Sequence, residues 1–91
     1  MTDIDLASPG RPPHRLARGP STRFGPVLRQ LRVSRGWSQE HLAAQAGLNR
    51  SYMGEIERSA AMPSLATAEK LAHALEVALS ELISHCERAP A

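Results

Sequence analysis

Residues 38–58 read SQEHLAAQAGLNRSYMGEIER, and this stretch decides the fold. Ser38 is a good helix N-cap, and Gly47 is typical of the residue that follows a helix. Asn49, a second good N-cap, comes only two residues after that glycine. The sequence therefore predicts two short helices at about 39–46 and 50–58, joined by a turn so short that the second helix leaves the first at a sharp angle.

Small and apolar side chains allow these two helices to pack closely. Ala43 and Ala46 are small enough for a near approach, and Leu48 in the turn can lie between the helices. Met53 and Ile56 supply the inward stripe of the second helix. The pair is expected to form a helix-turn-helix unit.

Helical spacing continues on both sides of the pair. Apolar residues recur every three or four positions from Phe24 onward, which predicts a helix that starts near Ser21 or Thr22 and stops at Gly36. Farther along, Pro63 and Ser64 open a fourth helix, and Ser80 is expected to cap a fifth. No segment alternates as a strand would, so the predicted fold is all-α, a compact five-helix bundle over residues 22–88.

The first part of the chain has a different composition. Residues 1–21 are rich in proline and glycine and contain little apolar surface, which predicts a flexible basic arm. Arg11, Arg15 and Arg18 could reach a DNA minor groove from such an arm. The simpler interpretation is a solvated tail that contacts nothing.

Composition also bears on several classes of function. No apolar run approaches the roughly 20 residues of a membrane span, and the N-terminus lacks a signal-peptide pattern, so we expect a cytoplasmic protein. The single Cys86 and four scattered His show no zinc spacing. No nucleophile with a neighbouring base or phosphate-binding loop can be assembled. We expect no metal, cofactor, small-molecule ligand or enzymatic activity.

The charges are unevenly distributed along the chain. Residues 1–22 carry a net charge of +1, residues 23–58 carry +3 and residues 59–91 carry −2. Local fields rather than totals attract a polyanion, so the middle segment is the candidate for binding nucleic acid.

The outward face of the helix at about 50–58 is the expected contact surface. With Met53 and Ile56 inward, Ser51, Gly54, Glu55 and Arg58 are expected to point away, flanked by Arg50 and Tyr52.

Each of these outward residues has a plausible contact. Arg50 can bind guanine or clamp a phosphate, and Ser51 can donate or accept at a base edge. Tyr52 could contact DNA or pack on the preceding helix, and Gly54 removes bulk. Glu55 remains open between cytosine contact and orientation of an arginine.

Several short motifs together resemble the Cro/C1-type (XRE) helix-turn-helix family of phage repressors and bacterial regulators, which has the lambda repressor-like fold. The resemblance covers residues 24–83, and its marks are Leu28-x-x-Leu31-Arg32, the run from Gly36 to Ala43, Ala46-Gly47-Leu48, Ile56-Glu57-Arg58, Pro63-Ser64-Leu65 and Leu71-Ala72-x-Ala74-Leu75. The run Asn49–Arg58 is further similar to the recognition helix of restriction-modification controller proteins.

The resemblance implies roles for individual residues. Gln39 is expected to bind a phosphate and support recognition-helix side chains, and Arg32 and Glu57 are expected to form a largely buried structural ion pair. Ser59 and Glu76 stand where the family often has glycine, which puts loop geometry in doubt. The full expected DNA-binding set is Ser38, Gln39, Asn49, Arg50, Ser51, Tyr52, Gly54, Glu55 and Arg58.

The implied function is a transcriptional regulator that binds a double-stranded operator as a homodimer on an inverted repeat. A possible dimer surface is Leu79, Leu82 and Ile83, although these residues could simply close the core. His73, His85 and Cys86 near this end could tune an interface, but the simpler expectation is that they occupy solvated helix positions. The competing hypothesis is a protein-interaction module whose arm folds on a partner.

Overall fold

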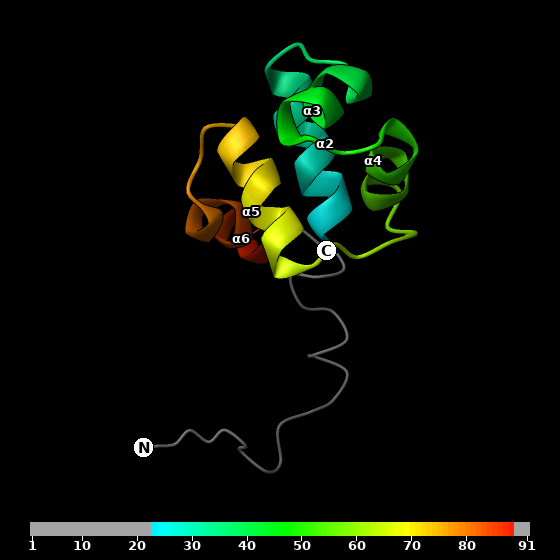
Figure 1. Cartoon of the computed structure of the whole chain (residues 1–91). Coiled ribbons are helices and arrows are strands. Elements are labelled where there is room, and N and C mark those ends of the chain that lie inside the picture. The colour runs from blue at the N-terminus through cyan, green and yellow to red at the C-terminus, as the bar shows by residue number, and fades with distance from the viewer. Residues whose placement is uncertain (1–22, 89–91) are drawn as a thin grey trace.

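The computed structural model describes residues 23–88, so the predicted arm at residues 1–21 lies outside the described residues. Within this range the chain forms five α-helices and no strand. They are α2 (Phe24–Ser34), α3 (Gln39–Ala46), α4 (Arg50–Glu57), α5 (Leu65–Ala74) and α6 (Leu79–Arg88) (Figure 1). The all-α, five-helix prediction is confirmed. None of the helices between residues 23 and 88 has the length and apolarity to cross a membrane.

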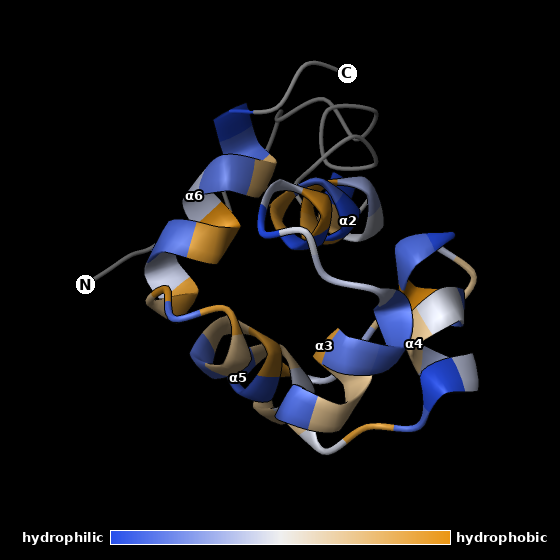
Figure 2. Cartoon of the chain, turned by 90° about the horizontal axis from the view of Figure 1, so that it is seen from above, coloured by the Kyte–Doolittle hydropathy of each residue, from blue (hydrophilic) through white to orange (hydrophobic). Residues whose placement is uncertain are grey.

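The helices pack so that α4 is supported on one side only. α2 contacts α4 and α6, α3 contacts α4 and α5, and α5 contacts α6. Figures 1 and 2 both place α4 at one side of the domain and α6 at the opposite side. Since α4 packs only on α2 and α3 among the principal contacts, one of its faces remains open to solvent.

One apolar core joins all five helices. Its buried members are Phe24, Val27, Leu28, Leu42, Ala43, Ala46, Met53, Ile56, Ala68, Leu71, Ala72, Leu75, Leu82 and Cys86. Leu31, Leu48, Val77 and Leu79 are partly buried against this core. The inward stripes predicted for the two helices of the helix-turn-helix are therefore the surfaces that hold them to the domain.

The predicted N-caps of three helices are confirmed by side-chain hydrogen bonds. Ser38 Oγ accepts from the His41 N–H at 3.0 Å, Asn49 Oδ1 from the Tyr52 N–H at 3.2 Å, and Ser64 Oγ from the Thr67 N–H at 3.1 Å. Each satisfies an amide that has no partner within its own helix.

The predicted cap of the last helix is wrong. α6 begins at Leu79, so Ser80 lies inside its first turn. The residue that serves this helix end is Glu81, whose Oε1 accepts from the Ala78 N–H at 2.9 Å. Ala78, the residue before the helix, has no side-chain acceptor for the first amides of α6, and the Glu81 carboxylate bonds back to its N–H while lying near the positive end of the helix dipole.

Four residues in left-handed conformation separate the helices. Gly36 has a φ of 72° and Gly47 a φ of 69°. Ser59 and Glu76, the two departures from the family pattern, have φ values of 62° and 60°. Both residues therefore adopt the left-handed conformation that favours glycine, and their backbones carry the conformational strain.

Gly25 has a structural role that the sequence patterns did not indicate. A Cβ at this position would lie 2.3 Å from Ile56 O and 2.7 Å from Glu57 O. The first turn of α2 therefore crosses the end of α4 at backbone contact distance, which only glycine permits. This crossing fixes the C-terminal end of α4 against the domain.

Candidate nucleic-acid interface

The solvent-facing side of α4 carries polar and charged residues. Arg50, Ser51, Glu55 and Arg58 are exposed, whereas Met53 and Ile56 are buried. Tyr52 is half-buried and packs against the edge of the core, so its ring belongs partly to the fold. The helical-wheel prediction therefore places these residues correctly.

Six of the residues named from the sequence line one polar hollow where α4 meets the start of α3. They are Gln39, Arg50, Ser51, Gly54, Glu55 and Arg58. Two arginines and one glutamate give the hollow a net positive charge. Neither Arg50 nor Arg58 has an ion-pair partner among residues 23–88. Both guanidinium groups are therefore available to an anionic or hydrogen-bonding ligand.

Ser38 and Asn49 do not line this hollow. Their side-chain oxygens already accept the capping hydrogen bonds of α3 and α4. They hold the two helix N-termini in place beside the hollow, and their side chains have less capacity to bind a ligand than the sequence suggested.

Gly54, which was predicted to point away from the core, is buried. It does lie on the outward side of α4, but two side chains cover it. A Cβ at Gly54 would be 3.0 Å from Nη1 of Arg58 and 3.7 Å from Oε1 of Gln39. The absence of a side chain lets both polar groups rest on the helix backbone.

A buried ion pair lies directly beneath the hollow. Arg32 donates from Nε to Glu57 Oε2 at 2.6 Å and from Nη2 to Glu57 Oε1 at 3.0 Å. Arg32 Nη1 also donates to Trp37 O at 2.6 Å. The hydrogen bond to Glu57 raises the pKa of Arg32 above its ordinary value, which keeps the guanidinium charged. The pair ties α2 to the end of α4.

Gln39 links this ion pair to the hollow. Its Nε2 donates to Glu57 Oε1 at 3.0 Å, and its Oε1 faces Gly54. The amide is thereby held in one orientation by a buried carboxylate. The family resemblance implied that Gln39 lies at this interface, but the carboxylate that orients it is evident only in the folded chain.

The proposed dimer surface on α6 is partly wrong. Leu82 is fully buried in the core, and so is Cys86, which was expected at a solvated position. Both face α2 and α5, because the stripe on α6 that includes them closes the bundle. Leu79 and Ile83 are half-buried and keep part of their surface accessible.

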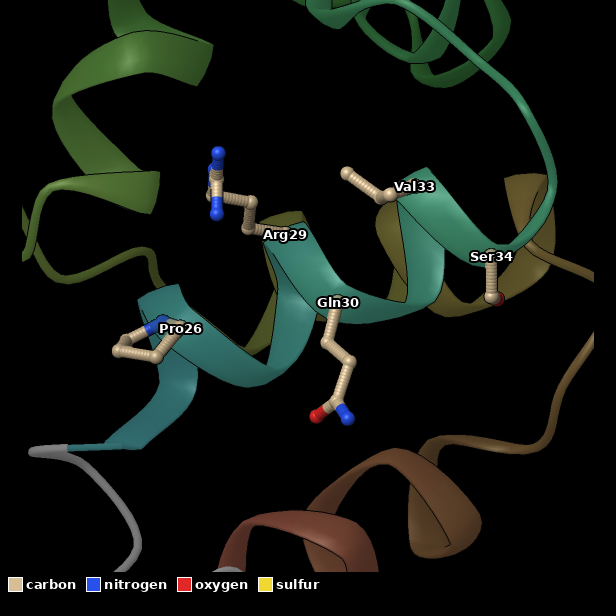
Figure 3. A pocket seen from close by; sticks show the side chains of 5 residues that line it. All are labelled: Pro26, Arg29, Gln30, Val33 and Ser34. Atoms are coloured by element: carbon tan, nitrogen blue, oxygen red, sulfur yellow. The ribbon is translucent and has the colours of Figure 1, made fainter.

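A second depression follows the outer face of α2 (Figure 3), and its lining residues are Pro26, Arg29, Gln30, Val33 and Ser34. Its side chains do not converge. Arg29 and Val33 project from one side of the helix, whereas Gln30 projects from the other. The five lining residues include one cation, Arg29, and no acidic side chain.

A comparison with known families settles what this fold is. The helix-turn-helix family pattern matches residues 28–82, which is more than half of the chain. The chain belongs to the helix-turn-helix family. The Cro/C1-type resemblance seen in the sequence is thereby confirmed.

Solved and curated relatives of this helix-turn-helix protein support the assignment. The restriction-modification controller protein C.AhdI from Aeromonas hydrophila is 48% identical, with a TM-score of 0.64 over 66% of this chain and 91% of that one. SinR, a master regulator for biofilm formation solved in complex with DNA, is 34% identical, with a TM-score of 0.62 over 66% of this chain and 97% of that one.

A third relative is longer. A hypothetical transcription factor from Neisseria meningitidis is 46% identical over 56 residues, which are 62% of this chain and 53% of the relative. The chain thus spans about half the length of this curated relative.

Proposed function

We propose that this helix-turn-helix protein is a transcriptional regulator that binds double-stranded DNA sequence-specifically and places α4 in the major groove. The observation that carries the proposal is the polar hollow on α4, which presents two unpaired arginines beside the N-terminus of α3. A major groove is wide enough to admit a helix, and its base edges carry the pattern of donors and acceptors that such side chains read.

The side chains of the hollow suit different parts of DNA. Arg50, in the first turn of α4, can donate two hydrogen bonds to guanine O6 and N7, and neighbouring Ser51 can contact an adjacent base. Glu55 can accept from the amino group of cytosine. Tyr52 is half-buried and is not among the lining residues of the hollow, and the contact proposed for its hydroxyl is a phosphate.

Gln39 is assigned to the DNA backbone. One hydrogen of its amide nitrogen is used by Glu57, and the other can donate to a phosphate. The N-terminal amides of α3, apart from that of His41, can support the same anion. Such a contact would fix the position of the domain without reading sequence.

The proposed assembly is a homodimer on an inverted repeat. A single domain covers few base pairs, and a two-fold axis doubles the contact. The accessible parts of Leu79 and Ile83 are the proposed apolar contact on α6. The likeness to a controller protein and to a regulator solved with DNA supports this proposal. A role on chromosomal DNA would place the protein in the cytoplasm.

The test is selection of bound sequences from a random double-stranded DNA pool with the full chain. We expect one enriched motif with two-fold symmetry. Gel shifts with Arg50→Ala should then show a loss of about 5- to 150-fold, confined to DNA that carries the preferred base at one position. Gln39→Ala should weaken all sequences alike and leave the salt dependence almost unchanged, because glutamine carries no charge.

The absence of any enriched motif would reject the operator hypothesis. Retained capture of a protein partner by the same chain would then favour the interaction-module hypothesis. A motif without two-fold symmetry would reject the inverted-repeat assembly and leave major-groove binding in place.

A further inference from the structure

We propose that Gly54 is a positioning residue for DNA recognition: its missing side chain lets the Arg58 guanidinium lie across α4 and join Arg50 at the polar hollow. This inference rests on the proposed function. Arg58 has a defined location in this proposal, and Gly54 makes that location possible.

The geometry of α4 explains why a glycine is needed. Arg58 follows the last residue of α4 and sits four positions after Gly54, so its side chain points back over the preceding turn. Arg58 Nη1 and Cζ lie 3.0 and 3.9 Å from the place that a Cβ of residue 54 would occupy. A Cβ at that position would therefore require the guanidinium to shift by a few tenths of an ångström, and a larger side chain would displace it further from the helix surface.

Gln39 borders the same place from the other side. Its Oε1 is 3.7 Å from the Cβ position, and its amide is held by Glu57. The guanidinium of Arg58 thus occupies a space bounded by the backbone of α4 and by an oriented amide. Arg58 remains exposed in this place, so its guanidinium can still reach a ligand, and its charge is added to that of Arg50.

Stability of the fold gives no reason for glycine at this position. Gly54 has no left-handed backbone angle, and the nearest atoms to its Cβ position belong to flexible side chains. Alanine is a better helix former than glycine at an interior helical position. Glycine at this position therefore lowers the stability of the helix, but it leaves the space that Arg58 fills.

The experiment is a double-variant cycle on the full chain, with the selected DNA duplex as the probe. The variants are Gly54→Ala, Arg58→Ala and the pair together, measured by fluorescence anisotropy across salt concentrations. We expect Gly54→Ala to weaken binding about fivefold to tenfold and Arg58→Ala about tenfold or more. The pair should be no weaker than Arg58→Ala alone within about twofold, because both changes remove the same contact.

Two further measurements distinguish a positioning role of Gly54 from a general loss of folding in the variants. Gly54→Ala should raise the melting temperature while it lowers affinity, a combination that a misfolded variant cannot give. Arg58→Ala should reduce the salt slope by about one. His73→Ala, on the exposed side of α5, is the matched control and should leave affinity unchanged.

The outcomes distinguish this inference from the proposed function. Unchanged affinity of Gly54→Ala, or additive losses in the double variant, would overturn the role of Gly54 while Arg50→Ala still reports on DNA binding. If the wild-type protein binds no DNA, both proposals fail together.

Discussion

Removing one partner of the buried Arg32–Glu57 ion pair should cost a large part of the stability of this domain. The Glu57 carboxylate accepts three hydrogen bonds, two from Arg32 and one from Gln39, at 2.6 to 3.0 Å. The side chains of Arg32 and Glu57 are only 10% and 2% exposed. In Glu57→Gln the guanidinium would stay buried without a counter-charge, and its acceptors would be Trp37 O and the single amide oxygen of the substituted side chain.

The size of the effect follows from this burial. Removing one partner of a buried pair costs about 3–5 kcal/mol, because the other charge is left without compensation. A domain of this size has a free energy of unfolding of about 3–10 kcal/mol. Glu57→Gln should therefore lower the melting temperature by more than about 12 °C, given about 4–8 °C per kcal/mol in small domains.

The assay is thermal and urea unfolding followed by circular dichroism for Glu57→Gln, Arg32→Met and the double variant Arg32→Met/Glu57→Leu. The double variant should recover at least half of the loss, since no isolated charge remains buried. The pKa of Arg32 is raised, so its stabilising contribution is complete below its ordinary pKa and is lost only at more alkaline pH. Measurements near neutral pH thus compare fully charged arginines. A loss below about 1 kcal/mol in Glu57→Gln, or a double variant as unstable as the single ones, would contradict the reasoning.

Three further predictions concern other parts of the domain. Burial raises the pKa of the Cys86 thiol, so the contribution of the neutral thiol to stability is complete at neutral pH and falls as the pH rises above the ordinary thiol pKa. Urea unfolding at pH 7 and at alkaline pH should show this loss of stability in the wild type and not in Cys86→Ala. Ser59→Gly should stabilise the domain by about 0.5–1 kcal/mol, because glycine relieves the strain of a left-handed serine. Ala44→Gly, at an exposed position of α3, should instead destabilise it by about 1 kcal/mol. If thermal unfolding shows the same effect for both variants, Ser59 is not strained. Ile83→Asp should lower self-association in sedimentation without changing the circular dichroism spectrum, and a wild-type protein that is already monomeric would exclude the proposed dimer surface.

The helices of this domain could be predicted from sequence because their signals are local. Caps such as Ser38 and Asn49 act within one turn of their own helix, and the spacing of Met53 and Ile56 identifies the inward side of α4. The start of α6 was misplaced because Ser80 is as good a cap by type as the other serines. Only the contact between Glu81 and the Ala78 amide shows which residue serves the helix end.

The features that escaped prediction depend on contacts between segments distant in sequence. Gly25 looks like an ordinary helix residue until α2 crosses the carbonyls of α4. Gly54 was assigned correctly to the outward side of α4, but no helical wheel shows that Arg58 and Gln39 cover it. Leu82 was ambiguous between core and partner surface, and the packing of α6 on α2 and α5 decides for the core.

One side of α4 packs on the core and the other side faces solvent, and this separation has a consequence for evolution. Met53 and Ile56 anchor the helix, whereas Arg50, Ser51 and Glu55 make no side-chain hydrogen bond or ion pair within residues 23–88. Substitutions at these three positions should therefore leave folding intact while they change the partner that is recognised. A duplicated copy of such a gene could acquire a new target through a few surface changes, each of them compatible with a folded protein.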